Sequence, residues 1–278
     1  MSPIRPHIRQ KIRKAYVDGP FGQVHLRIAG TPTDSGPPPL ICLHQSPKCG
    51  LEFEAFMAAA SETRQVIAPD YPGYGMSDPP PAEEEATIPN YARAMWATID
   101  ALGLTTVDLF GNHTGAKVAA EMATQQTARV HAIAMVSAAI LTDAEREMFK
   151  DMFTPIPLDD AHTRLTTSWA RIHARRGPGQ TLEMLDRSLF MNMTGGEAYE
   201  WGHVAAFAWG KPFEDALAAL PQRITLLNPS DDLTECTRRA APLMRNGEVI
   251  ECPDWGYGFM DVFTQDAAAL VLGKLDQS

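Results

Sequence analysis

The sequence lacks the features that would tie the protein to a membrane, to nucleic acid or to an oxidising compartment. No apolar run approaches the length of a membrane-spanning helix, and the N-terminus has no signal-peptide core. The 24 lysines and arginines are outnumbered by 34 acidic residues, and the net charge of −10 argues against nucleic acid and anionic membranes as partners. The four cysteines show no paired spacing, so we expect reduced thiols in a cytoplasmic protein.

Two further absences concern serine and histidine. No serine stands at the centre of a G-x-S-x-G frame, because that frame reads Gly111-Asn112-His113-Thr114-Gly115. The last histidine of the chain is His203, so the C-terminal segment contains none. A mechanism that needs a serine in this frame and a histidine near the C-terminus is therefore excluded.

Strands and helices alternate through the first half of the chain. Alternating residues on both sides of the Gly-Pro-Phe-Gly turn at 19–22 predict a β-hairpin. Short apolar runs then predict buried strands at 40–43, 65–69, 107–111 and 130–137, with helical patterns between them. Such alternation indicates a parallel sheet covered by helices on both faces.

The alternation breaks between residues 140 and 220. This segment is helical in pattern and rich in methionine and aromatic residues, and strands resume at 223–229 and 248–253 before a final helix. We therefore predict one core domain formed by 1–139 and 221–278, interrupted by a helical cap at 140–220.

Five motifs at the ends of predicted strands resemble those of the α/β-hydrolase fold family, in the same order along the chain. They are LHQSP at 43–47, APDYPGYGMSDPP at 68–80, GNHTG at 111–115, NPSDDL at 228–233 and PDWGYGF at 253–259. The resemblance covers nearly the whole chain. It implies an α/β-hydrolase fold with a mostly parallel eight-stranded sheet flanked by helices, a helical cap and no cofactor.

The sequence departs from this family at two of the three catalytic positions. His113 stands at the nucleophile elbow, and Tyr257 stands where the family has its histidine. The acid is retained as Asp231, with Asp232 as the alternative.

We predict that His113 acts as a base or as a nucleophile. It lies at the start of a helix, whose positive end favours the neutral imidazole. On this hypothesis Asp231 orients His113 directly or through one water, and Tyr257 donates a hydrogen bond or transfers a proton.

The resemblance also implies a pocket of backbone N–H groups for an oxyanion. One donor comes from Asn112 or Thr114 and the other from Gln45 or Ser46, with Thr114 favoured by analogy with the fold. Gln45 replaces a glycine of the family motif, which adds a side-chain amide near the pocket.

Each of these residues also has a purely structural interpretation. His113 fits a degenerate elbow in a protein that binds without catalysis, Tyr257 fits ordinary packing, and Asp231 fits the cap of a helix that starts at SDDLTE. His44 is predicted to hold loop backbone. The other histidines lack the spacing of metal ligands, so no metal site is expected.

The predicted cap supplies the candidates for substrate contact. We expect Trp201, His203 and Trp209 to line the pocket, which would suit a small apolar or aromatic carbonyl compound. Three hypotheses remain: a hydrolase for an ester, lactone, amide or epoxide, a lyase or C–C bond-cleaving enzyme, and a non-catalytic ligand-binding protein. The oligomeric state stays open, a homodimer included.

Overall fold

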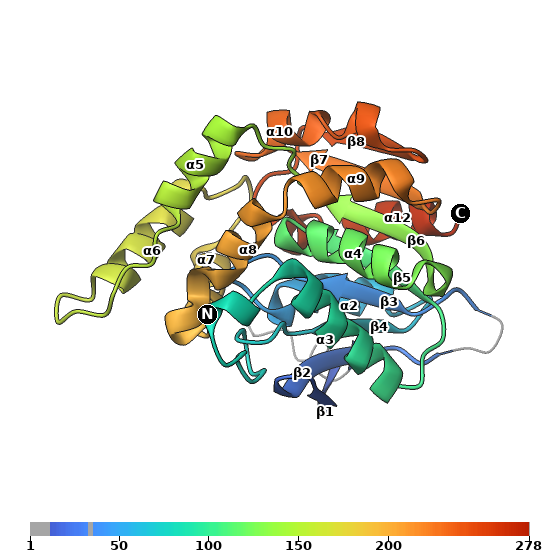
Figure 1. Cartoon of the computed structure of the whole chain (residues 1–278), viewed down its shortest axis with the longest axis horizontal. Coiled ribbons are helices and arrows are strands. Elements are labelled where there is room, and N and C mark those ends of the chain that lie inside the picture. The colour runs from blue at the N-terminus through green and yellow to red at the C-terminus, as the bar shows by residue number, and fades with distance from the viewer. Residues whose placement is uncertain (1–11, 33–35, 278) are drawn as a thin grey trace.

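The computed structural model describes residues 12–32 and 36–277, so the first eleven residues of the predicted core domain lie outside it. At its centre is an eight-stranded sheet with the order β1-β2-β4-β3-β5-β6-β7-β8 (Figure 1). The strands are β1 Ile12–Gly19, β2 Gly22–Ala29, β3 Leu40–Leu43, β4 Val66–Pro69, β5 Val107–Asn112, β6 Val130–Val136, β7 Arg223–Pro229 and β8 Gly247–Cys252. β2 runs antiparallel to β1 and β4, and the other neighbours are parallel. The predicted fold class is confirmed.

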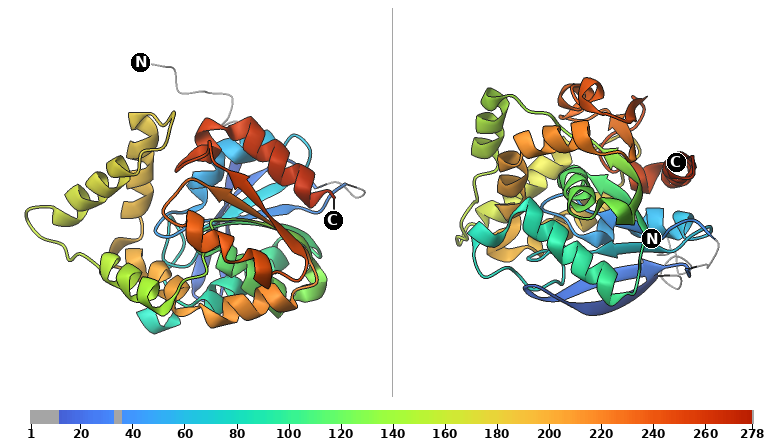
Figure 2. Two further views of the ribbon diagram at one scale, coloured as in Figure 1. Left: turned by 90° about the horizontal axis from the view of Figure 1, so that it is seen from above. Right: turned by 45° about the vertical axis from the view of Figure 1, so that its right-hand side comes forward.

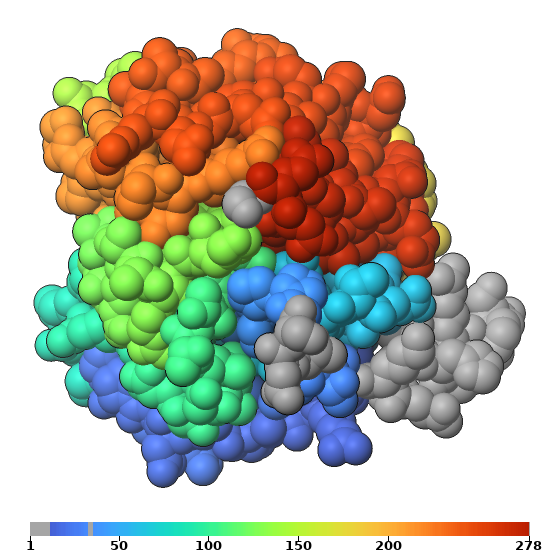
Figure 3. All heavy atoms as spheres, turned by 90° about the vertical axis from the view of Figure 1, so that its right-hand side faces the viewer, coloured from blue at the N-terminus to red at the C-terminus, as the bar shows by residue number. Residues whose placement is uncertain are grey.

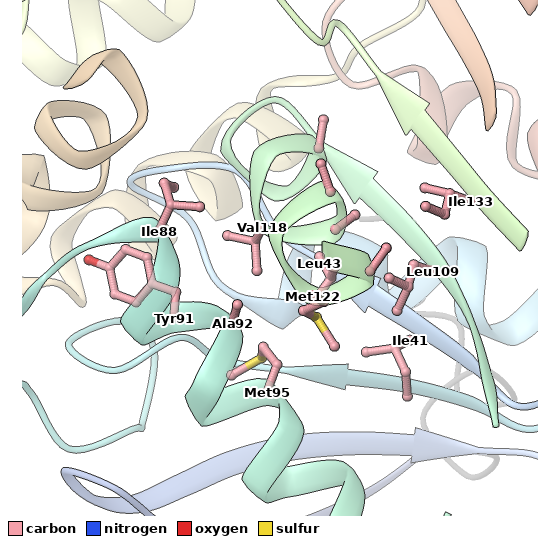
Figure 4. Close-up of a cluster of buried hydrophobic side chains, with 14 of the residues drawn as sticks. Ile41, Leu43, Ile88, Tyr91, Ala92, Met95, Leu109, Val118, Met122 and Ile133 are labelled. Atoms are coloured by element: carbon pink, nitrogen blue, oxygen red, sulfur yellow. The ribbon is translucent and has the colours of Figure 1, made fainter. Parts of the chain in front are cut away.

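Helices cover both faces of this sheet. One face carries α3 Ile88–Ala101, α4 Thr114–Gln125 and α9 Lys211–Ala219, and the other carries α2 Glu54–Ala60 and α12 Thr264–Leu275. Figure 4 shows the first layer, where Met95 of α3 and Met122 of α4 lie beside Ile41 and Leu109 of the sheet in one buried cluster. β3, β4 and β5 are buried along their whole length, so their sequences do not alternate between apolar and polar residues; β3 and β4 are apolar throughout, and β5 adds the buried polar residues Asp108 and Asn112.

The second layer brings the C-terminal helix against an early helix of the chain. α12 packs against α2, and the space-filling view in Figure 3 shows the dark red surface of the C-terminal helix beside light blue early segments. The short helices α10 Thr234–Arg238 and α11 Phe259–Val262 follow β7 and β8. They continue the two C-terminal loops that carry Asp231 and Tyr257.

The chain between β6 and β7 is helical. It forms α5 Asp143–Met152, α6 Thr163–Ala174, α7 Leu182–Met193 and α8 Trp201–Ala208, and then α9. Figure 2 shows α5, α6 and α7 projecting from the sheet layers. α5 buries only Phe149, and α6, all of whose residues are described, contains no buried residue.

The last helix of the predicted cap range packs differently from the others. Phe213 and Leu217 of α9 are fully buried in the cluster that covers the sheet, and α9 contacts α4. α9 therefore belongs to the helical layer on the sheet, although it lies within residues 140–220. In the part of the chain that the structure describes, no helix is both long and apolar enough to cross a membrane.

Candidate active site

The turn between β5 and α4 holds His113 in a backbone conformation that few residues adopt. Its φ of 49° lies in the left-handed region, which costs a non-glycine residue roughly 1–3 kcal/mol. The turn requires glycine on both sides: a Cβ on Gly111 would lie 2.2 Å from the carbonyl oxygen of Gly115, and one on Gly115 would lie 2.0 Å from that of Leu43. The predicted elbow is confirmed, and the tight turn projects the imidazole beyond the end of the sheet.

The loop after β7 brings Asp231 next to this imidazole. Nε2 of His113 lies 3.4 Å from Oδ2 of Asp231, which is longer than an ideal hydrogen bond but within ion-pair distance. The side chain of Asp231 is 3% exposed and that of His113 is 18% exposed. Nδ1 of His113 has no hydrogen-bond partner in the described part of the chain. The adjacent carboxylate favours the tautomer that carries its proton on Nε2, which leaves Nδ1 as the basic nitrogen.

The charges around His113 act against its neutral form. Burial disfavours the imidazolium, but the adjacent Asp231 and the negative charges of Asp232 and Glu52 outweigh burial and raise the pKa of His113. The expected shift toward the neutral imidazole is therefore wrong in direction. The three carboxylates raise the pKa of His113 by more than the positive end of the helix lowers it. Burial raises the pKa of Asp231. Its contacts with His113, Ser137 and the N–H of Leu233 outweigh burial, so the net pKa is below the ordinary value.

Asp231 has two further partners, one of which the sequence interpretation missed. Oδ2 accepts a 2.5 Å hydrogen bond from the hydroxyl of Ser137, and Oδ1 accepts a 2.8 Å bond from the backbone N–H of Leu233. Ser137 follows β6 directly and is buried, with a φ of 51°. Its position at the carboxyl end of a central strand was the only signal that could have pointed to it. The bond to Leu233 shows that Asp231 also fixes the turn before α10, while its other oxygen faces His113.

Asp232 and Tyr257 form a separate pair beside the first. The hydroxyl of Tyr257 donates to Oδ1 of Asp232, and Arg175 donates to Oδ2 over 3.1 Å. The rings of Tyr257 and His113 are tilted by 29°, with centroids 6.4 Å apart. Burial and the two nearby carboxylates raise the pKa of Tyr257. Tyr257 therefore stays protonated at neutral pH and hydrogen-bonds to Asp232, not to Asp231.

The backbone N–H groups predicted to bind an oxyanion differ in whether they are already hydrogen-bonded. The N–H of Gln45 donates to Oε1 of Glu52 over 2.9 Å, and the Gln45 side-chain amide donates to Oε2 over 2.9 Å. Gln45 is therefore occupied and cannot receive an oxyanion, which corrects its predicted role. The N–H of Ser46 points to Oγ1 of Thr114 over a long 3.4 Å. The N–H of Thr114 has no acceptor among the described residues, so it remains the best candidate. The amide of Asn112 lines the cavity with its Oδ1 buried and unpaired.

His44 has the structural role predicted for it. The ring is fully buried, Nδ1 lies 2.9 Å from the carbonyl oxygen of Gln45, and Nε2 accepts from the N–H of Tyr71 over 2.8 Å. Burial lowers the pKa of His44 to about 4. It is therefore a neutral ring that ties the loop after β3 to the loop after β4.

His113, Thr114, Asp231, Asp232 and Tyr257 line one cavity of about 230 Å³ between the strand ends and helices α5 to α8, and His44 lies outside its lining. That volume is somewhat below the roughly 300 Å³ at which pockets for drug-sized ligands begin, and it suits a small molecule. Aromatic and aliphatic side chains form part of the wall, namely Leu141, Phe149, Phe153, Leu185, Met191 and Phe207. No cluster of three or more metal-ligating side chains occurs within residues 12–32 and 36–277.

Of the three residues predicted to contact the substrate, one lines the cavity and two do not. His203 lines the cavity, where its ring stacks on Phe153 with centroids 4.0 Å apart. Trp201 and Trp209 do not line it, and that prediction is wrong. Both pack against the core cluster between α3, α4 and the sheet. The helical pattern predicted that this segment forms helices rich in aromatic residues. It did not predict which side of each helix faces the cavity.

Comparisons with known proteins agree with this architecture. A family model described as alpha/beta hydrolase fold matches residues 38–209. Haloalkane dehalogenase 2 from Mycobacterium tuberculosis is 28% identical over 120 residues, which are 43% of this chain and 40% of that protein. A haloalkane dehalogenase from Psychrobacter cryohalolentis is 33% identical over 81 residues, or 28% of this chain and 27% of that protein. The matches thus span less than half of these curated relatives.

Solved structures match over nearly the full chain at low identity. An epoxide hydrolase from Vigna radiata has a TM-score of 0.75 at 15% identity, covering 97% of this chain and 99% of that one. An esterase from Exiguobacterium antarcticum has a TM-score of 0.76 at 15% identity, covering 95% of this chain and all of that one. At this level of identity the likeness shows the fold alone.

Proposed function

Since the chain belongs to the α/β-hydrolase fold family, we propose that it hydrolyses a small carbonyl compound with a histidine–aspartate pair in place of a serine triad. One observation carries this proposal. Nε2 of His113 lies 3.4 Å from the buried Asp231 carboxylate, while Nδ1 is unpaired in the described structure and His113 lines the cavity. A histidine oriented on one nitrogen and free on the other is suited to general-base catalysis.

The proposed reaction adds one water to an ester or lactone. Nδ1 of His113 removes a proton from the water as its oxygen attacks the carbonyl carbon. The carbonyl oxygen becomes an oxyanion and accepts a hydrogen bond from the N–H of Thr114. When the tetrahedral intermediate collapses, the bond to the alkoxy group breaks and the imidazolium returns its proton to the leaving oxygen. An acid and an alcohol are released, and Asp231 stabilises the positive charge of the ring between the two proton transfers.

The helices α5 to α8 act as the cap in this proposal. They close the cavity over the strand ends with aromatic side chains, while the reacting groups come from the core. The cap accommodates the apolar part of the substrate and excludes bulk water, which strengthens the charge interactions around His113.

The test is acid release from a panel of short esters, lactones and amides, measured for the wild type and for His113→Ala. Loss of the base should lower turnover by roughly 10²- to 10⁴-fold without loss of fold. The matched control is His173→Ala, which removes an exposed histidine of α6 outside the cavity lining.

Wild-type turnover in His113→Ala would refute the proposal. If no substrate is cleaved but an apolar ligand raises the melting temperature, the protein is a ligand-binding member of the family. Cleavage of a C–C bond without water uptake would instead assign it as a lyase.

A further inference from the structure

The carboxylates that line the cavity are mostly neutralised by the protein itself. Five acidic residues contribute to the lining. Four of these have a cationic or imidazole partner: Asp231 with His113, Asp232 with Arg175, Asp261 with Arg187, and Glu200 with His203. The fifth, Glu52, accepts hydrogen bonds on both oxygens from Gln45. Each of these acids is therefore already held by a group of the protein itself.

Three cations of the same wall have no carboxylate partner among the described residues. Two of them have a structural explanation. Nζ of Lys117 donates to the carbonyl of Ala206 over 2.6 Å, in the last turn of α8. Arg171 donates to the carbonyl of Met152 over 3.0 Å, at the last residue of α5. Cations commonly satisfy the free carbonyls of a helix C-terminus in this way.

Lys48 is the third, and no helix end explains it. Its ammonium group donates to the hydroxyl of Ser188 on α7, and both residues line the cavity. Lys48 makes no direct ion pair within the described residues. The carboxylates of Glu52, which bonds to Gln45, and of Asp261, which pairs with Arg187, act on it only from a distance. Burial is the largest influence on the pKa of Lys48, and it lowers this pKa although those two carboxylates raise it. An enclosed cation with no carboxylate in direct contact costs free energy, and that cost is relieved when a bound anion contacts it.

The position of Lys48 relates it to the reacting groups. It lies two residues after Ser46 in the loop that follows β3, and its backbone N–H donates to the carbonyl of Gln45 over 3.0 Å. The same loop contacts Thr114 through the N–H of Ser46. An anion held at Lys48 is thus held by the same loop that adjoins the candidate oxyanion donor.

We propose that Lys48 and Ser188 bind a carboxylate of the substrate, so that the cavity selects carbonyl compounds bearing a negative charge, such as a monoester of a dicarboxylic acid. This inference rests on the proposed hydrolase function, which it refines by naming the substrate class. It adds a negative charge to the small apolar or aromatic carbonyl compound expected from the sequence. The aromatic wall accommodates the apolar part, and the ammonium and hydroxyl groups supply two donors for the carboxylate oxygens.

The experiment compares the binding of hexanoate with that of hexanamide, which has nearly the same shape but no charge. Dissociation constants are measured by calorimetry on the wild type, Lys48→Met and Lys48→Arg, with Lys150→Met as the matched control because Lys150 is exposed on α5. We expect the wild type, Lys48→Arg and Lys150→Met to prefer hexanoate by about tenfold or more. Lys48→Met should bind both compounds equally.

Equal affinity of the wild type for both compounds, or a preference that persists in Lys48→Met, would overturn the inference. If Lys48→Met does not fold, Ser188→Ala decides: it should weaken hexanoate several-fold and leave hexanamide unchanged, and unchanged hexanoate binding would count against the proposal. Binding is measured without turnover. Failure of this inference therefore leaves hydrolysis of neutral esters intact, and failure of the hydrolase proposal leaves the binding preference intact.

Discussion

The hydroxyl of Ser137 donates a 2.5 Å hydrogen bond to Oδ2 of Asp231, the same carboxylate oxygen that lies 3.4 Å from Nε2 of His113. One carboxylate oxygen thus serves two partners, one from the end of β6 and one from the elbow. Ser137 reaches it from a left-handed backbone conformation that is unfavourable for serine. A strained residue beside a buried carboxylate indicates that the position of the hydroxyl matters to the site.

Ser137→Ala should destabilise the fold and alter the site together. The buried carboxylate loses a donor, and we expect the free energy of unfolding to fall by about 1–3 kcal/mol. Asp231 becomes more basic without this donor, so the pKa of His113 rises and the acid limb of the pH–rate profile moves to higher pH. Urea unfolding and the pH profile measure the two effects.

Ser137→Gly is the matched variant for the backbone strain. It removes the same hydroxyl but adopts positive φ without a Cβ penalty, so it should be about 1 kcal/mol more stable than Ser137→Ala. Both variants should show the same shift in the pH profile. Equal stability of the two would show that the left-handed backbone at Ser137 is not strained, and an unmoved profile would remove Ser137 from the site.

The pH dependence of turnover should follow the titration of His113. The base is active only when neutral, and Asp231, Asp232 and Glu52 raise its pKa above the ordinary 6.5. Turnover should therefore rise with pH and level off above the raised pKa. Asp231→Asn removes the closest negative charge, so the pKa of His113 falls and the acid limb moves to lower pH, while the plateau decreases.

Asp232→Asn is the comparison for this prediction. It removes a more distant charge and should move the limb in the same direction by less. A larger shift for Asp232→Asn than for Asp231→Asn would assign the functional acid to Asp232. A profile that does not respond to either variant would mean that His113 does not limit turnover.

Tyr257→Phe should have a small effect on turnover. The hydroxyl bonds to Asp232, which keeps its 3.1 Å contact with Arg175, and the aromatic ring remains opposite His113. We expect a loss of less than about tenfold, against the roughly 10²- to 10⁴-fold that loss of a general base costs. Tyr16→Phe on the exposed strand β1 is the control. A loss as large as that of His113→Ala would make the phenol a proton donor in the reaction.

Asp70 anchors the loop after β4, and we expect the stability of the fold to depend strongly on its carboxylate. Its carboxylate accepts from His25 and from the N–H of Gly50 over 2.8 Å each and from the N–H of Met76 over 3.0 Å, and it lies 3.4 Å from Arg27. Breaking such a buried network costs about 3–5 kcal/mol, so Asp70→Asn should lower the unfolding free energy by that amount.

The stability that Asp70 supplies depends on pH in a defined direction. Burial raises the pKa of Asp70, but the contacts with His25 and Arg27 outweigh burial. The pKa in the folded protein is therefore below the ordinary 3.8. The contribution is therefore complete above pH 3.8 and is lost as the pH falls through the lowered pKa. Urea unfolding across this acidic range should show a weaker pH dependence in Asp70→Asn than in the exposed control Asp215→Asn. Equal slopes would contradict the assignment.

The fold class and the sharp turn that carries His113 could both be predicted from residue patterns alone. The hairpin strands alternate in polarity and most central strands are apolar runs, and the glycines at 111 and 115 are needed locally, so short-range chemistry was sufficient. The absence of histidine after His203 likewise excluded the family's usual catalytic base without any structure.

The partners of each site residue could not be predicted in this way, because they depend on how distant segments pack together. Asp231 and Asp232 are adjacent in sequence, and their different partners, Ser137 and Tyr257, depend on where separate loops cross above the sheet. Trp201 and Trp209 face the core and not the cavity because of how their segment packs onto α3 and α4. The pKa of His113 depends on carboxylates from two distant segments, the one with Asp231 and Asp232 and the one with Glu52. Charge interactions follow distance in space, not separation along the chain.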